Sequence, residues 1–144
     1  MKIAFYIAKY GTFYDKLISF TTRSIYSHCE IVFEDNLPSI SASASVRDGG
    51  VRFKRIRFDH HWHVYDLETD LKEENVIKWF NEHDGDTYDY IGAIGSLFSL
   101  DLSSKDKKFC SQACATVLRL NPITTPGKFF NKLKTLGVIK CNNK

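Results

Sequence analysis

The sequence predicts an α+β fold in which an antiparallel sheet packs against helices, and two observations favour this class. Residues 26–68 hold short runs of alternating apolar and polar residues, which are typical of strands, whereas beyond residue 70 the apolar residues recur at helical spacing. Strands that precede helices, rather than alternating with them, indicate α+β. With 144 residues, 43% of them hydrophobic, the chain is expected to form one domain spanning residues 1–144.

The N-terminal quarter predicts a strand, a helix and a second strand. Ile3–Ala8 is a short apolar run suited to a buried strand, and Thr12 can cap a following amphipathic helix. The apolar residues of that helix are Phe13, Leu17 and Phe20, at i, i+4 and i+7. In Tyr26–Phe33, apolar side chains alternate with His28 and Glu30. One face of this strand is therefore apolar, and the other carries chemically active groups.

Three more strands are expected before residue 70. Ile40–Val46 alternates serine with apolar residues, and Asp48-Gly49-Gly50 then leads into Val51–Phe58, which is typical of a hairpin. Trp62–Leu67 is the next strand candidate. Because these segments follow one another closely, the centre of the chain is expected to form an antiparallel meander.

Two helices are expected between residues 70 and 100. Asp70 and Glu73 stand at capping-box spacing before an apolar periodic segment, so they predict the start of a helix that ends near Gly85. A second, shorter helix is expected to start near Asp89. The apolar stretch Ile91–Leu100 has ten residues, whereas a membrane-spanning helix needs roughly 20.

Two further helices are expected in the C-terminal part of the chain. The first begins at about Cys110 and has an apolar stripe that includes Cys114. The second has Thr125 as its N-cap, Pro126 at its first position and Gly137 just beyond its end. The helix that starts at Cys110 is important for function, because its first turn carries the thiol discussed below.

Charge and hydropathy exclude some classes of protein. A net charge of +3 is too small to argue for nucleic acid. The basic residues Arg52, Lys54 and Arg55 fall in a predicted strand, where a solvated strand face is expected and an anionic ligand or partner is the alternative. The apolar run at residues 3–8 is too short for a secretory signal. We therefore expect a soluble, cytoplasmic protein without a membrane span.

One of the four cysteines has features of a nucleophile. Cys29, Cys110, Cys114 and Cys141 form no CxxC pair, so a zinc site is not expected. Cys29 and Cys114 are interpreted as small buried hydrophobes, and Cys141 lies in a polar tail. A thiol in the first turn of a helix lies near unpaired backbone N–H groups and the positive end of the helix dipole, both of which favour the thiolate. Cys110 is therefore the candidate nucleophile.

A cysteine nucleophile needs a base, and His28 is the candidate. His28 is the histidine on the strand that also carries Glu30. His60, His61 and His63 superficially suggest a metal cluster, but no well-spaced carboxylate or thiol stands beside them in the sequence. No metal and no cofactor are therefore expected.

Four segments of the chain resemble a known family. They are Tyr26-Ser27-His28-Cys29-Glu30-Ile31-Val32-Phe33, then Ser43-Ala44-Ser45-Val46-Arg47-Asp48-Gly49-Gly50-Val51-Arg52, then Tyr88-Asp89-Tyr90-Ile91-Gly92, and then Phe109-Cys110-Ser111-Gln112. Together they resemble the circularly permuted NlpC-type, papain-like superfamily, the YiiX-like group, and most closely its bacteriophage members. In ordinary papain-like enzymes the cysteine precedes the histidine, whereas in the permuted group the histidine strand comes first, as it does here.

The resemblance implies roles for individual residues. Cys110 matches the nucleophile, at the N-terminus of a helix in the C-terminal half, and His28 matches the general base. Glu30 matches the acidic position two residues after the histidine, which would orient the imidazole. Its alternatives are Ser43 and Ser45, which a neighbouring strand could place beside His28. The chain departs from the family at Gln112, where an acidic residue is more usual.

The resemblance also implies a range of functions. The leading expectation is a cysteine hydrolase that cleaves an amide or related acyl bond through a thioester, with a peptide, a peptidoglycan fragment or another acyl compound as substrate. The alternatives are a lipid acyltransferase or thioesterase of the lecithin:retinol acyltransferase type, and a binding or virion-assembly module without catalysis. Tyr26 and Tyr88 could line the substrate pocket, although a structural role is equally open for both.

Overall fold

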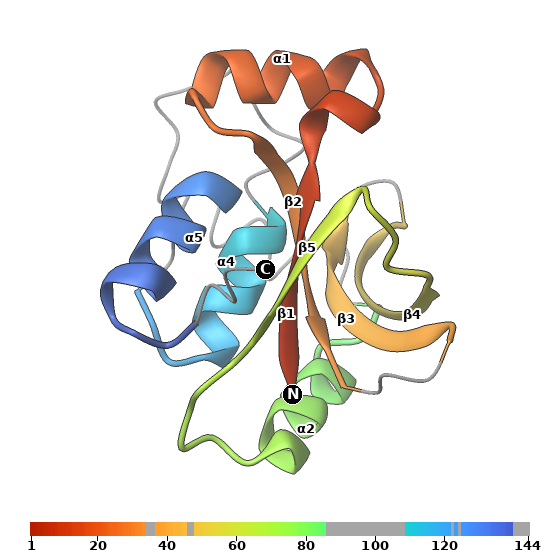
Figure 1. The fold of residues 1–144 in the computed structure, drawn as a ribbon. Coiled ribbons are helices and arrows are strands. Elements are labelled where there is room, and N and C mark those ends of the chain that lie inside the picture. The colour runs from red at the N-terminus through yellow and green to blue at the C-terminus, as the bar shows by residue number, and fades with distance from the viewer. Residues whose placement is uncertain (34–36, 46–47, 86–108, 122, 124, 140–144) are drawn as a thin grey trace.

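A computed structural model describes residues 1–33, 37–45, 48–85, 109–121, 123 and 125–139. Its described strands are β1 (Lys2–Ile7), β2 (Tyr26–Val32), β3 (Ser39–Ser45), β4 (Gly50–Ile56) and β5 (Trp62–Asp66). The described helices are α1 (Phe13–Thr22), α2 (Glu73–Glu82), α4 (Phe109–Val117) and α5 (Pro126–Thr135), with the short 3₁₀ helix η1 (Ala8–Tyr10). The five strands form one antiparallel sheet, which confirms the α+β class (Figure 1). The helix expected near Asp89, the segment around Tyr88 and Cys141 lie outside the described residues.

The strand order of the sheet is β4-β3-β2-β1-β5. Strands β2, β3 and β4 form the expected meander, since each pairs with the next in antiparallel orientation. The expectation was wrong for β5, which pairs with β1 at the opposite edge from β4. The N-terminal strand is therefore an interior strand flanked by β2 and β5, and its apolar residues Ile3 and Phe5 are fully buried.

The ladder of backbone pairs between β2 and β3 is short, and α4 packs beside it. The two strands are hydrogen-bonded as a ladder at Ile31–Ala42 and Val32–Ser41. Toward the start of β2 the ladder is not continued, and α4 packs against both strands (Figure 1). The first turn of α4 therefore lies close to the half of β2 that carries His28.

Helix α1 forms as expected. Its predicted apolar residues, however, lie toward solvent and not in the core. Phe13 and Phe20 are 75% and 83% exposed to solvent, whereas Asp15 is buried. The carboxylate of Asp15 accepts hydrogen bonds from the backbone N–H and the hydroxyl of Thr12, each at 2.8 Å. A side chain at Gly11 would overlap Asp15. These contacts form the N-terminal cap of the helix, and the buried side of α1 consists of Asp15 and Ile18 while Phe13 and Phe20 face outward.

The remaining described helices match their sequence signals except at one start. Helix α2 begins at Glu73 with Lys72 as its N-cap, so the cap predicted at Asp70 is wrong. The carboxylate of Glu73 instead lies 3.5 Å from the N-terminal ammonium of Met1, so it does not complete a capping box with Asp70. Helix α5 starts as predicted, because the Thr125 hydroxyl accepts a hydrogen bond from the backbone N–H of Lys128.

Candidate active site

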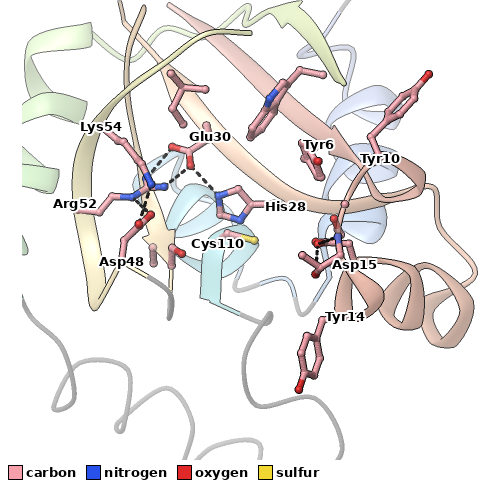
Figure 2. A pocket seen from close by; sticks show the side chains of 17 residues that line it. Tyr6, Tyr10, Tyr14, Asp15, His28, Glu30, Asp48, Arg52, Lys54 and Cys110 are labelled. Carbon is pink, nitrogen blue, oxygen red and sulfur yellow. Dashed lines mark hydrogen bonds and ion pairs between the residues drawn. The ribbon is translucent and has the colours of Figure 1, made fainter. Parts of the chain in front are cut away.

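The predicted nucleophile and base lie together at one cavity. Cys110 is the second residue of α4, within the first turn, where backbone N–H groups have no acceptor inside the helix. His28 lies in the middle of β2, and Figure 2 shows its ring beside the sulfur of Cys110. Both line a cavity of about 820 Å³. The other walls are aromatic on one side, from Tyr6, Tyr10, Tyr14 and Trp62, and charged on the other, from Asp48, Arg52 and Lys54.

The carboxylate of Glu30 contacts the imidazole of His28. Oε1 of Glu30 lies 2.7 Å from Nε2 of His28, although the two residues are separated by a full pleat of β2. Of the three orienting residues considered from the sequence, Glu30 makes this contact. Ser43 instead donates a hydrogen bond of 2.7 Å to the backbone carbonyl of Cys29, and Ser45 lies in the cavity wall. Because Nε2 is engaged by Glu30, Nδ1 is the ring nitrogen left for the thiol.

Cys110 and His28 stabilise each other as a thiolate and an imidazolium. The pKa of Cys110 lies well below its ordinary value of 9.0, because the Cys29 thiol and the His28 ring donate hydrogen bonds and His28 adds a positive charge, which together outweigh burial. Burial also opposes a charged imidazole. The thiolate of Cys110 and the hydrogen bonds to Cys110 and Glu30 outweigh it and raise the pKa of His28 from 6.5 to about 10. The pair is therefore charged around neutral pH.

Cys29 is a functional neighbour of the thiolate that sequence reasoning missed. Burial of Cys29 and Cys114 was predicted and is confirmed, and both are free thiols. Burial raises the pKa of Cys29 well above its ordinary value, and hydrogen bonds to Cys110 and Cys114 add to this effect. Cys29 therefore keeps its proton and donates it toward Cys110. The period-2 pattern of β2 marked Cys29 as apolar and held no signal for this contact.

Arg52 is the second residue of the site that the sequence did not identify. Its guanidinium forms a forked ion pair with Glu30, with Nη1–Oε2 at 2.8 Å and Nη2–Oε1 at 2.6 Å. The solvated face expected for this strand is therefore wrong at Arg52, whose side chain is 12% exposed. The reason is Glu30, which is fully buried and needs a cation as a partner. Because the burial of Glu30 is seen only in the folded chain, the sequence held no signal for this pair.

Tyr26 and Ser27 lie next to each other at the start of β2 but differ in their relation to the cavity. The hydroxyl of Tyr26 lies 2.8 Å from Nδ1 of His63, and Tyr26 is not among the described residues that line the cavity, so these contacts favour the structural role left open for it. Ser27 does line the cavity. Its buried hydroxyl has no hydrogen-bond partner in the described part of the chain.

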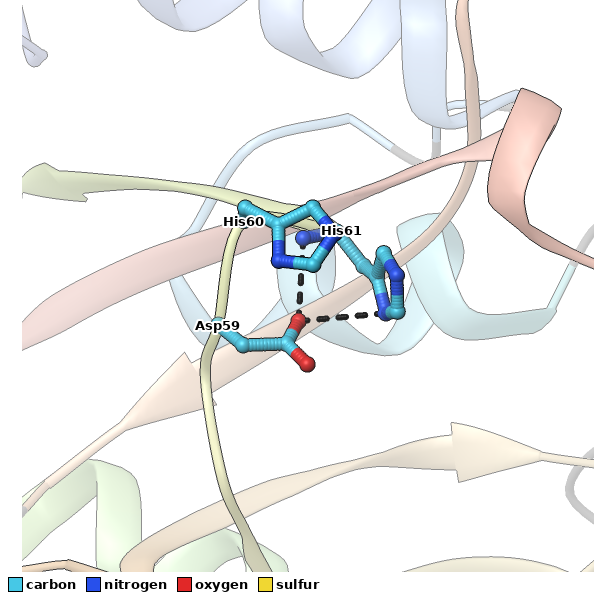
Figure 3. Close-up of side chains that lie close together, drawn as sticks. All are labelled: Asp59, His60 and His61. Atoms are coloured by element: carbon cyan, nitrogen blue, oxygen red, sulfur yellow. Dashed lines mark hydrogen bonds and ion pairs between the residues drawn. The ribbon is translucent and has the colours of Figure 1, made fainter.

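The histidine cluster has a carboxylate neighbour that sequence reasoning overlooked. Ligand atoms of Asp59, His60 and His61 lie within 4.8 Å of one another (Figure 3). Oδ1 of Asp59 accepts a hydrogen bond of 2.9 Å from the backbone N–H of His61 and lies 3.2 Å from its Nδ1. This is the geometry of an aspartate that stabilises a turn. The turn precedes β5, and Asp59 and His60 are exposed to solvent.

The contact of Ser43 leads to a prediction that separates it from Glu30. Ser43→Ala leaves the buried carbonyl of Cys29 without its hydroxyl donor, so we expect a loss of about 1–3 kcal/mol in the free energy of unfolding, measured with urea. The pH midpoint of Cys110 alkylation by iodoacetamide should stay unchanged, because Ser43 does not contact His28. Ser45→Ala is the control for stability. A shifted midpoint in Ser43→Ala would give Ser43 the role assigned to Glu30.

The fold and this geometry define an α+β protein in which a partly exposed imidazole contacts a buried thiol and a buried carboxylate. Comparisons with models of protein families, with curated proteins and with solved structures found no match. In the described residues, no helix combines the length and the apolar character that crossing a membrane would require. The chemistry of the site must therefore be argued from its own residues.

Proposed function

We propose that this chain is a cysteine hydrolase built on a permuted papain-like domain, which cleaves an amide or related acyl bond. The observation that carries the proposal is a line of two contacts: Cys110 of α4 contacts His28 of β2, and His28 contacts Glu30 on the same strand. A thiolate, an acid–base imidazole and an orienting carboxylate are the three groups that thiol acyl transfer requires. The position of Cys110 in the first turn of its helix, after the histidine strand in sequence, supports the permuted papain-like resemblance.

The first half of the reaction forms a thioester. The thiolate of Cys110 attacks the carbonyl carbon, a C–S bond forms, and the carbonyl electron pair moves to the oxygen. Backbone N–H groups in the first turn of α4 would donate to this oxyanion. When the tetrahedral adduct collapses, the C–N bond breaks, and the leaving nitrogen takes the proton of the His28 imidazolium.

The second half releases the acid. Neutral His28 accepts a proton from a water molecule as its oxygen attacks the thioester carbon. Collapse of the second adduct breaks the C–S bond and restores the thiolate of Cys110 and the imidazolium of His28. Glu30 remains ionised throughout and holds the ring by Nε2, since burial is outweighed by hydrogen bonds from His28 and Arg52 that lower its pKa.

The walls of the cavity indicate the type of substrate. Aromatic side chains on one wall and charged ones on the other suit a polar chain with some apolar surface. A peptide-type amide, including a peptidoglycan peptide, has this character. We therefore propose a peptide-type amide as the substrate class.

The pH dependence of thiol alkylation tests the proposed ion pair. We expect iodoacetamide to label Cys110 with a midpoint at least about 2 pH units below that of glutathione, because the thiolate alone reacts. The rate should stay on a plateau until His28 loses its proton near pH 10. Peptide mass spectrometry assigns the labelled cysteine, and rapid acid quenching during turnover of p-nitrophenyl acetate should trap an acetyl group on Cys110 before water removes it. Labelling with the midpoint of glutathione and no acetyl group would contradict the proposal.

A further inference from the structure

A chain of alternating charges runs from the thiol to the surface. Cys110 contacts His28, His28 contacts Glu30, and Glu30 contacts Arg52 (Figure 2). Beyond Arg52, the carboxylate of Asp48 accepts hydrogen bonds of 2.8 Å from Nε of Arg52 and 2.8 Å from Nζ of Lys54. Each member lies between partners of opposite charge, so a change at the outer end can reach the thiol through direct contacts.

Among these charged residues, Glu30 has the least access to replacement partners. Its side chain has no exposure to solvent, so water cannot replace a lost partner. Oε1 receives both Nε2 of His28 and Nη2 of Arg52, and Oε2 receives Nη1 of Arg52. Two of these three donors come from one guanidinium. The orientation of the carboxylate is therefore fixed mainly by Arg52.

Small side chains on β3 allow Arg52 to reach Glu30 across the sheet. Arg52 lies on β4, and β3 stands between it and β2. From Ser41 to Ser45, β3 carries only serine and alanine, so no large side chain separates Arg52 from Glu30. The fork uses Nη1 and Nη2 toward Glu30 and leaves Nε for Asp48, which holds the guanidinium plane from its other edge.

We propose that Arg52 is a positioning residue for the reaction, because its fork keeps Glu30 ionised and aimed at Nε2 of His28, which leaves Nδ1 turned toward Cys110. The inference rests on the proposed function. Without the fork, a fully buried carboxylate would either take up a proton or turn away from the ring. In both cases the imidazolium of His28 loses its carboxylate partner and gives up its proton more readily, and without that positive charge the thiolate of Cys110 is less stabilised.

Several titratable groups surround His28 and Glu30, and the test must separate Arg52 from them. They are Cys29 on β2, Cys110 and Cys114 on α4, Arg52 and Lys54 on β4, Asp48 before β4, and Tyr6, Tyr10, Tyr14 and Asp15 across the cavity. Lys54 is the matched control among them. It carries the same charge, also binds Asp48 and is two residues along the same strand, but its described contacts do not include Glu30.

The experiment compares Arg52→Met, Arg52→Lys and Lys54→Met in the full chain. We expect the pH midpoint of Cys110 alkylation to rise by about 1 unit in Arg52→Met and by less in Arg52→Lys, which keeps the charge but not the fork. Lys54→Met should give a clearly smaller shift than Arg52→Met, because its charge is more exposed and screened. The downfield NMR signal of the Nε2 proton of His28 should weaken in both Arg52 variants and remain in Lys54→Met.

Each contrary result would overturn the positioning role. A folded Arg52→Met protein with the unaltered midpoint would do so, as would a Lys54→Met shift of equal size. An Arg52→Lys protein with the original midpoint and Nε2 proton signal would show that charge suffices without the fork. If Arg52→Met does not fold, Arg52→Lys decides. Should the unaltered protein alkylate like glutathione, the proposed function fails, and the Nε2 signal still tests the contact of Arg52 with Glu30.

Discussion

His28→Ala is expected to reduce the alkylation rate of Cys110 at about pH 6.5 by about 100-fold or more. The imidazolium supplies both a positive charge and a hydrogen bond to the thiolate. Without it, Cys110 is 2% exposed and surrounded by apolar side chains and thiols, an environment that favours the neutral form. Its alkylation midpoint should therefore move to alkaline pH. Acetylation by p-nitrophenyl acetate should fall by a factor of about 10² to 10⁴, since the acid–base group is lost.

His63→Ala is the control for this experiment. His63 lies on β5 and contacts the hydroxyl of Tyr26, so its removal also disturbs an imidazole contact of the sheet without touching Cys110. We expect His63→Ala to retain the acidic alkylation midpoint. The proposed pair would be refuted if His28→Ala kept that midpoint in a folded protein, because another group would then stabilise the thiolate.

Glu30→Ala is expected to have the largest effect on stability, a loss of about 3–5 kcal/mol in the free energy of unfolding. The substitution leaves the largely buried guanidinium of Arg52 without its forked partner. Asp48→Ala is the control, because Asp48 also binds Arg52 but its side chain is 25% exposed. We expect it to cost about 1 kcal/mol or less. Urea denaturation at neutral pH measures both, and equal losses would contradict the central position of Glu30.

The pH dependence of stability provides a second measurement on Glu30. The folded pKa of Glu30 is lowered from its ordinary value of 4.5, because hydrogen bonds from His28 and Arg52 outweigh burial. A depressed carboxyl pKa contributes stability above the unfolded value, and this contribution is lost as pH falls toward the folded value. The stability difference between the unaltered protein and Glu30→Gln should therefore shrink below about pH 4.5. A constant difference from pH 7 to pH 4 and below would show that Glu30 is not held ionised by these partners.

Local sequence patterns predicted most of the described elements, whereas pairings distant in sequence were harder to predict. The alternation of β2 and the Thr125-Pro126 start of α5 are local signals, and both elements begin where the pattern predicts. The placement of β5 beside β1 depends on which sheet edge is open, and the segment itself does not encode this. For α1, the periodic residues gave the helix but not its orientation, since Asp15 and Ile18 are its buried residues and Phe13 and Phe20 are exposed.

The residues of the candidate site show the same contrast between local patterns, which were predicted, and contacts between distant segments, which were not. His28 and Glu30 share one strand face, so period-2 geometry was enough to suggest their contact. Cys110 came from its helix position and from the order of the resembling segments. Arg52 and Cys29 needed the three-dimensional structure, since one crosses an intervening strand and the other presents a thiol from the apolar side of β2. Both supply hydrogen bonds to groups that the sequence did identify.

Because the ladder between β2 and β3 is short, the Arg52–Glu30 pair also helps to hold the β3–β4 hairpin against β2. Where backbone hydrogen bonds stop, the β3–β4 hairpin is tied to β2 by this fork and by the hydroxyl of Ser43. Backbone N–H groups on the β3 side of this part of β2 should consequently owe their protection from hydrogen exchange to side-chain contacts, whereas those on the other side are protected by pairing with β1. Loss of the Arg52–Glu30 pair would therefore weaken the attachment of the β3–β4 hairpin to β2 as well as the orientation of the imidazole.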